Sequence, residues 1–311
     1  MSGWSGRVDL PEGPATRRWH QWVREPVAGS APGVAMLGFA SDEGVRRNGG
    51  RVGAAEGPAA LRKMLSNLPL LDDTPLYDAG DVGVADGDLE GAQLRYAAKL
   101  AALLDAGHLP VGLGGGHEIA FATYQGLALH LGERRPRVAI VNFDAHFDLR
   151  EQDRASSGTP FLQAIKHAAA HGLPLDYCVL GISASANTRV LFDTADRLGV
   201  HYVRDDELGS FDLPARIAQL REKLANVDAV YLTFCLDALP HAMAPGVSAP
   251  SARGVAMEVV EPLLDAIAAT GKLKVMDVAE LSPPLDRDNV TARVAARLIH
   301  RVTHAAWRHK V

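Results

Sequence analysis

From residue 33 to the end of the chain, short apolar runs alternate with longer amphipathic stretches. The apolar runs are rich in Val, Ile, Leu and Phe and predict buried strands at 33–39, 76–80, 109–113, 137–143, 177–182, 201–203, 229–236 and 273–278. The stretches between them predict helices at 57–65, 89–106, 117–131, 157–171, 213–224, 257–270 and 290–307. This alternation indicates an α/β fold with βαβ units around a mostly parallel sheet.

Residues 1–30 contain three of the four tryptophans and lack this alternation. They predict an N-terminal arm, or a first helix at 16–27, that packs on the rest of the chain. No repeat or linker interrupts the later rhythm, so we expect residues 1–311 to form a single domain. The Pro- and Gly-rich stretch 240–254 lies inside the rhythm and predicts an active-site loop.

Composition excludes several classes of protein. The net charge of −5 argues against a nucleic-acid partner, which would require a basic excess. The chain has two cysteines, Cys178 and Cys235, so we expect no disulfide framework and a reducing compartment. There is no apolar signal-peptide core near the N-terminus and no run of about 18 apolar residues. We therefore expect a cytoplasmic protein with no membrane partner; a homo-oligomer stays open.

Three side chains that can bind metal alternate directly after the predicted strand 137–143. They are Asp144, His146 and Asp148. Whether the strand continues or the chain turns, all three crowd the carboxyl edge of the sheet, where α/β folds place their sites. Burying two carboxylates beside an imidazole is unfavourable without a cation. The segment therefore predicts a metal site, and a hydrogen-bonded Asp/His cluster capping the strand is the alternative.

Other predicted strands also end in side chains that can carry chemistry. His117 follows the glycines at 114–116, which lack the Lys-Ser/Thr of a phosphate-binding loop. Cys235 and Asp237 share a face at the end of the strand at 229–236. Glu280 lies just beyond the strand at 273–278. Taken singly, each residue also has a structural explanation. These are a helix start for His117, a small core residue for Cys235, a cap for Asp237 and a surface charge for Glu280.

Together these motifs carry a family resemblance. Gly-Gly-Gly-His-Glu at 114–118, Asp-Ala-His-Phe-Asp at 144–148, Leu-Asp at 236–237 and Asp-Val-Ala-Glu at 277–280 resemble the signatures of the ureohydrolases. That superfamily includes arginase, agmatinase and formimidoylglutamase. The resemblance, which runs from about residue 33 to the C-terminus, implies a three-layer α/β/α fold with an eight-stranded sheet and two manganese ions. The implied metal ligands are His117, Asp144 as a bridge, His146, Asp148 and Asp237.

Within the superfamily, the segments 42–48, 57–58, 156–161 and 244–250 resemble the formimidoylglutamases. That likeness implies a small-molecule substrate, N-formimino-L-glutamate, which is hydrolysed to L-glutamate and formamide in L-histidine degradation. Asp148 would transfer protons, and Glu280 would hold the cationic amidine. The two substrate carboxylates need cationic partners. The candidates are Arg150, Arg154, Arg189 and Arg47. Each of them could instead be a solvated surface residue. Arg150 leads because its position in arginases reads the substrate α-carboxylate.

Two residues depart from the superfamily pattern. Cys235 stands where most ureohydrolases have a bridging Asp, and a soft thiolate suits manganese poorly, so we expect a weak second metal or another ion. Ser157 stands where arginase and agmatinase have a proton-shuttling His, so metal-bound solvent, Asp148 or another group must protonate the leaving group. Ser157 is instead a candidate for binding substrate. Two other functions stay open. One is hydrolysis of a guanidino acid such as guanidinobutyrate, and the other is a degenerate ureohydrolase that acts as a binding protein.

Overall fold

A sheet of eight strands forms the centre of the molecule. The computed structural model describes residues 3–9 and 13–308. The strands follow the order β2-β1-β3-β8-β7-β4-β5-β6, and every pair is parallel. Their bounds are β1 Val34–Ala40, β2 Leu76–Gly83, β3 Leu109–Leu113, β4 Val138–Phe143, β5 Leu175–Ile182, β6 His201–Arg204, β7 Ala229–Cys235 and β8 Leu273–Ala279. The predicted eight-stranded α/β fold is confirmed, and the sheet is parallel throughout.

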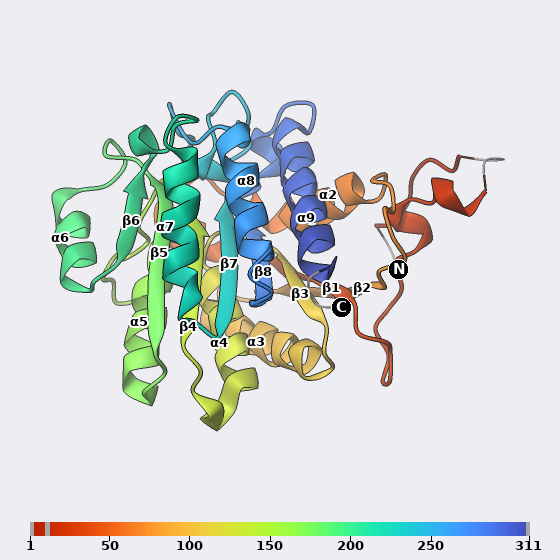
Figure 1. Cartoon of the computed structure of the whole chain (residues 1–311), viewed down its shortest axis with the longest axis horizontal. Helices are drawn as coiled ribbons and strands as arrows, with labels where there is room; N and C mark the ends of the chain where they lie inside the picture. The colour runs from red at the N-terminus through yellow and green to blue at the C-terminus, as the bar shows by residue number, and fades with distance from the viewer. Residues whose placement is uncertain (1–2, 10–12, 309–311) are drawn as a thin grey trace.

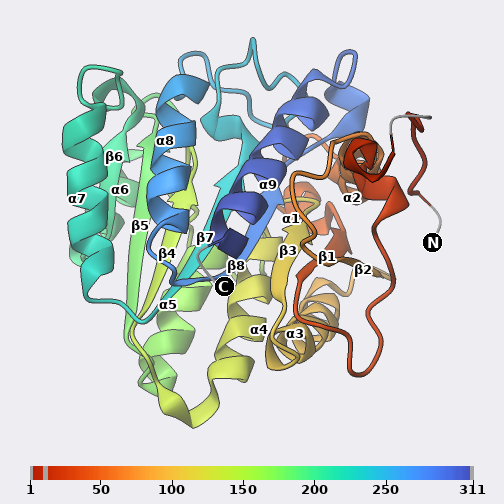
Figure 2. The same cartoon turned by 45° about the vertical axis from the view of Figure 1, so that its right-hand side comes forward.

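Helices cover both faces of this sheet, which gives the predicted three layers (Figure 1). One face carries α2 Gly57–Leu65, α7 Leu213–Ala225, α8 Met257–Ala268 and α9 Val290–Arg308. The other carries α3 Leu89–Asp105, α4 Ile119–Leu131 and α5 Pro160–His171. Figure 2 shows the two sets of helices on opposite sides of the strands. None of the described helices combines the length and the apolar character needed to cross a bilayer.

The two faces have separate apolar cores because side chains alternate along each strand. In β1, Met36 belongs to the core under α2, α8 and α9, whereas its neighbour Leu37 belongs to the core under α3 and α4. In β4, Val141 and Ile140 divide in the same way. Both faces of these strands are therefore buried, which explains why they are almost wholly apolar in sequence.

The predicted helix at 16–27 is wrong. The segment contains only the 3-10 turns Pro14–Thr16 and Trp19–Gln21, and its backbone otherwise pairs with neighbouring chain. Arg24 donates its N–H to the Leu76 carbonyl at 3.0 Å and accepts from the Asp78 N–H at 2.9 Å. Those bonds use backbone groups that a helix would have paired internally. The side chain of Trp19 is fully buried.

Two short helices were not predicted. They are α1 Glu43–Arg47 and α6 Arg189–Arg197. The first has five residues, too few for a helical period to show in sequence. The second buries only Leu191 and Ala195, one turn apart. Tertiary contacts, rather than an apolar stripe, decide both helices.

Candidate active site

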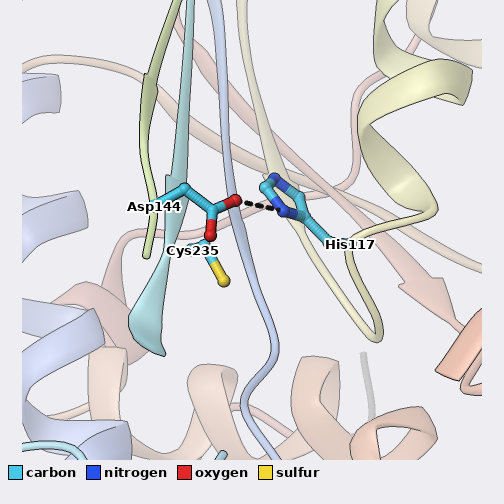
Figure 3. A group of neighbouring side chains, drawn as sticks. All are labelled: His117, Asp144 and Cys235. Carbon is cyan, nitrogen blue, oxygen red and sulfur yellow. Dashed lines mark ion pairs between the residues drawn. The ribbon is translucent and has the colours of Figure 1, made fainter. Parts of the chain in front are cut away.

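Four neighbouring strands at the middle of the sheet bring the predicted site residues together. The strands β3, β8, β7 and β4 are adjacent in the sheet although they are far apart in the chain. Their register aligns Phe143 with Phe234 and Cys235 with Ala279, so the residues that follow each strand meet at one edge. Figure 3 shows His117, Asp144 and Cys235 converging there.

The chain turns sharply after β4 instead of extending the strand. Asp144 accepts the His146 N–H on Oδ1 at 2.8 Å, which reverses the backbone. Asp148 then has φ of 50°, a conformation that a non-glycine residue rarely adopts. Three alternating side chains therefore point into one site from a loop, with Asp144 fully buried. Strain of this kind is typical of functional sites.

Two groups of three donor atoms share Asp144. One group contains His117, Asp144 and Cys235, and the other contains Asp144, His146 and Asp237. Within each group the donor atoms lie within 4.8 Å of one another. His146 Nδ1 lies 3.2 Å from Asp237 Oδ2. The two groups thus offer donor atoms for metal ions, with Asp144 common to both.

Asp148 lies beside the first group without belonging to either one. Its Oδ2 is 3.0 Å from His117 Nδ1, and Asp144 Oδ2 is 2.9 Å from the same nitrogen. That nitrogen is buried but makes no hydrogen bond with proper geometry. The other ring nitrogen, Nε2, lies 3.0 Å from the Thr233 hydroxyl. A ring fixed through one nitrogen, with the other aimed at carboxylates, is how a histidine presents itself to a metal. The donors therefore fit a metal centre.

The electrostatics of the buried groups indicate a surplus of negative charge. Burial, together with the nearby Asp144 carboxylate, raises the pKa of Asp148 to about 6. Burial also raises the pKa of the Cys235 thiol well above 9, as do the neighbouring carboxylates. Although burial alone would lower the pKa of His117, the Asp144 and Asp148 carboxylates beside its Nδ1 raise it well above 6.5. Bound cations would reduce the repulsion between these groups by pairing with the carboxylates.

Glu280 comes directly after β8 and lines the same cavity. Its Oε1 accepts the His117 N–H at 2.8 Å, and its own N–H donates to the Gly115 carbonyl at 2.8 Å. Burial, together with repulsion from Asp237 and Glu118, raises the pKa of Glu280 to about 8. The carboxylate is thus fixed in place in a position where a cationic ligand would stabilise its charged form.

A cavity of about 360 Å³ opens above these residues. Arg150 lines it, whereas Arg154 and Arg189 do not. Arg189 is 94% exposed in its side chain and pairs loosely with Asp193. Arg47 is buried between Glu43 and Glu90, which neutralise it. Of the four arginines predicted from sequence, only Arg150 is therefore placed to touch a ligand in the cavity.

Ser157 also lines the cavity and is buried. Its hydroxyl accepts a hydrogen bond from the Asn48 side-chain amide at 3.3 Å. Gly158, the residue after Ser157, accepts the Arg150 backbone N–H on its carbonyl at 2.9 Å. Ser157 is thus held at the wall of the cavity by contacts with the segment that follows α1.

Several cavity residues were missed from the sequence. Arg51 and Asn48 follow α1, and Ser248 lies in the loop after β7. Asn187 positions the turn after β4, because its amide donates to the Ala145 carbonyl at 2.8 Å and its Oδ1 accepts the Phe147 N–H at 3.1 Å. The available signal was location: each lies in a segment that follows a strand at this edge of the sheet.

Known proteins of one family resemble nearly the whole chain. Residues 32–304 match the sequence profile of the arginase family. A formimidoylglutamase from Ralstonia nicotianae is 55% identical over 304 residues, which cover 96% of this chain and 94% of that protein. A formimidoylglutamase from Aeromonas salmonicida is 52% identical over 306 residues and covers 97% of each chain.

Solved structures also resemble this chain. The crystal structure of formimidoylglutamase from Bacillus subtilis has a TM-score of 0.85 at 21% identity and covers 98% of this chain and 95% of its own. That likeness concerns the fold alone. Trypanosoma cruzi formiminoglutamase, crystallised with Mn²⁺, has a TM-score of 0.78 at 26% identity, with 88% and 93% covered.

Proposed function

The chain belongs to the arginase family, and we infer that it hydrolyses N-formimino-L-glutamate to L-glutamate and formamide in the degradation of L-histidine. The observation that carries this inference is identity above 50% to formimidoylglutamases over nearly the full length of both chains. The cavity supports it, since its inner wall is acidic and its lining includes Arg150, a partner for a substrate carboxylate.

The family and the donor atoms support a manganese-dependent site, and we propose that it holds two ions. One would be held by His117, Asp144 and Cys235 with Asp148 beside them, and the other by Asp144, His146 and Asp237. When bound, such a pair supplies Lewis-acid chemistry and lowers the pKa of a shared water from about 16 toward ~7. Carboxylate and imidazole donors suit manganese; the thiol of Cys235 suits it less well.

The protein's own groups then orient the substrate and move protons. Glu280 holds the cationic amidine, because its carboxylate is anchored by the His117 N–H and lines the cavity. Asp148 accepts the proton of the attacking water and returns it to the departing amine nitrogen. The C–N bond to glutamate breaks, and the oxygen stays with the formyl carbon as formamide. Ser157 cannot shuttle protons as a histidine would, and we propose Asp148 for this role because it lies beside the donor atoms.

The test is a panel of substrates assayed for formamide and urea release with the manganese-loaded protein. We expect rapid formamide release from N-formimino-L-glutamate and nearly none of either product from arginine, agmatine or guanidinobutyrate. A higher kcat/KM for a guanidino acid would make the chain a guanidino-acid ureohydrolase. No release from any substrate, despite tight binding, would make it a degenerate relative that binds ligand.

Other sequence predictions stay predictions. We propose that the chain is one domain with residues 1–30 as an arm, and that it works in the cytoplasm. Both cysteines are free and buried, which fits a reducing compartment. Whether the chain forms a homo-oligomer is a matter for sedimentation or light scattering.

A further inference from the structure

Two arginines line the cavity, Arg51 and Arg150, and no lysine does. Among the described residues, no carboxylate lies within ion-pair distance of either guanidinium. Other arginines nearby are neutralised: Arg46 pairs with Glu43, and Arg47 pairs with Glu43 and Glu90. Arg51 and Arg150 thus face the cavity without a carboxylate partner among the described residues. A cavity built in this way is suited to a ligand that carries more than one negative charge.

Arg51 is fixed in place by the loop that follows β7. Its N–H donates to the Ser248 hydroxyl at 2.8 Å, its Nε donates to the Ser248 carbonyl at 2.9 Å, and its Nη2 donates to the Val247 carbonyl at 2.7 Å. Neutral carbonyls orient the guanidinium without cancelling its charge. Within the part of the chain that the structure describes, Nη1 makes no hydrogen bond. The side chain therefore presents a preorganised cationic edge, which lowers the entropic cost of binding an anion.

The loop that carries Arg51 approaches its neighbours closely at Gly50. A Cβ on Gly50 would come within 2.7 Å of the Ser248 hydroxyl and 2.8 Å of Val45 Cγ1. Nearby, a Cβ on Gly158 would come within 2.8 Å of Arg150 Cδ and 3.1 Å of Asn48 Nδ2. The loop after α1 and the side chain of Arg150 therefore meet over Gly158. Two cationic side chains from separate segments thus border one opening.

We propose that Arg51 binds the side-chain carboxylate of N-formimino-L-glutamate while Arg150 binds its α-carboxylate; this assignment rests on the proposed function. The α-carboxylate is attached to the carbon that carries the reacting nitrogen, so it must lie near the donor atoms. Arg150 is two residues from Asp148, whose Oδ2 lies 3.0 Å from His117 Nδ1. Arg51 comes from another loop and takes the more distant carboxylate.

This assignment makes Arg51 a determinant of specificity. A dianionic substrate would be repelled by the acidic inner wall, and the two guanidiniums compensate for that repulsion. A guanidino acid has one carboxylate and agmatine has none, so either would leave Arg51 without its partner. The preference of the enzyme among substrates should therefore depend on whether the substrate side chain carries a negative charge.

The experiment compares N-formimino-L-glutamate with N-formimino-L-glutamine, whose neutral amide replaces the side-chain carboxylate. The native protein and Arg51→Gln are assayed with manganese, and Gln keeps an N–H that can still reach the loop carbonyls. For Arg51→Gln we expect kcat/KM on the glutamate substrate to fall about 10- to 100-fold, mostly through KM. On the glutamine substrate it should change by less than about threefold.

Matched controls separate binding from folding. Arg46→Gln removes an arginine that is 61% exposed, belongs to the same segment and does not line the cavity, so both substrates should be turned over as by the native chain. Arg51→Lys restores the charge and should recover part of the preference. The thermal midpoints of all the variants show whether the loop stays folded.

The outcomes distinguish the two proposals. If Arg51→Gln lowers kcat/KM equally on both substrates, Arg51 only stabilises the packing of the loops, and the assignment is overturned. An undiminished preference for the glutamate substrate in Arg51→Gln would overturn it as well. If the native chain releases no formamide from N-formimino-L-glutamate, the proposed function fails, and the assignment falls with it.

Discussion

Cys235 is the residue whose chemistry departs most from its surroundings. It ends β7, is 1% exposed, and its sulfur belongs to a donor group with His117 and Asp144. Burial and the nearby carboxylates raise the pKa of its thiol, so only a bound cation would favour the thiolate. A thiolate is a soft donor, and the position it occupies is surrounded by hard oxygens.

We predict that Cys235→Asp binds manganese at least about tenfold more tightly at the weaker site than the native protein does, and that zinc competes less well. A carboxylate supplies hard, bridging oxygens where the thiol does not. Metal titration of the two proteins checks this. Cys178→Ala is the matched control, because Cys178 is the other buried free cysteine and lies outside both donor groups. Equal stoichiometry and affinity in the native protein and Cys235→Asp would mean that residue 235 is no ligand.

Arg150→Ala should weaken transition-state binding by roughly 2 kcal/mol, about 30-fold in kcat/KM, since an exposed arginine loses a charge-assisted contact at the lower end of the usual range. The loss should be much smaller for 4-formiminoaminobutyrate, which lacks the α-carboxylate. Steady-state kinetics on the two substrates measures it. Arg154→Ala, outside the cavity lining, should behave as the native protein. Equal losses on the two substrates would make Arg150 structural, and a large loss in Arg154→Ala would move the carboxylate site to Arg154.

At the scale of elements, the short helix α1 connects the candidate donor residues to the cavity opening. Glu118, which directly follows the donor His117, accepts the Ser41 hydroxyl at 2.9 Å and the Gly44 N–H at 2.8 Å on one oxygen. At the other end of the helix, Arg47 donates to the Ala155 carbonyl at 3.0 Å. The helix itself is too short to be stable alone, so these tertiary contacts determine its position.

Glu43, the first residue of α1, should stabilise this element in a pH-dependent way. Hydrogen bonding to Arg46 lowers the pKa of Glu43 to about 2 despite burial, with Arg47 contributing. The folded-state pKa lies below the unfolded value, so the stabilisation is present above about pH 4.5 and is lost as the pH falls toward 2. We expect Glu43→Gln to lower the free energy of unfolding at pH 7 by roughly 1 kcal/mol, or about 2 °C in thermal midpoint.

Thermal unfolding between pH 7 and pH 3 measures this difference, which should shrink toward the acid end. Glu90→Gln is the control, because Glu90 binds the same Arg47 but its side chain is 51% exposed. Its effect should be smaller at every pH. A constant difference between the native protein and Glu43→Gln across the pH range would show that charge pairing is not its cause.

At the scale of the whole molecule, the order of strands creates the site. Crossovers place β8 and β7 between β3 and β4, so four loops from distant parts of the sequence end at one edge. Ligands bind at such edges in parallel α/β sheets because strand ends and loops leave a crevice there. The acidic residues gathered in that crevice are close enough to repel one another when no cation is bound.

Metal removal should therefore destabilise the whole fold. A ligand that binds only the folded state stabilises it by about 2.7 kcal/mol at 100 times its dissociation constant. We expect chelator treatment to lower the thermal midpoint by several degrees and added manganese to restore it. In Asp144→Asn, which removes the charge shared by both donor groups, manganese should have much less effect. An identical midpoint with chelator and with manganese would contradict metal binding at this site.

The sequence by itself determined the strands, most of the helices and the candidate donor residues that follow the strands. Strand signals such as 137–143 are strong because both faces of a parallel strand are buried and therefore apolar. Motifs such as Asp144-x-His146 stand out because carboxylates and imidazoles directly after such strands are costly to bury unless a cation pairs with them. These features depend on neighbours in the chain, so they can be predicted from the local sequence pattern.

Only the tertiary structure decided which residues border the cavity. Arg51 and Arg47 are four residues apart and look alike in sequence, yet one lines the cavity and the other is neutralised by Glu43 and Glu90. The N-terminal segment likewise paired its backbone with β2 instead of forming the expected helix. In each case a long-range partner outweighed local preference, because the free energy comes from contacts between segments that are distant in the chain.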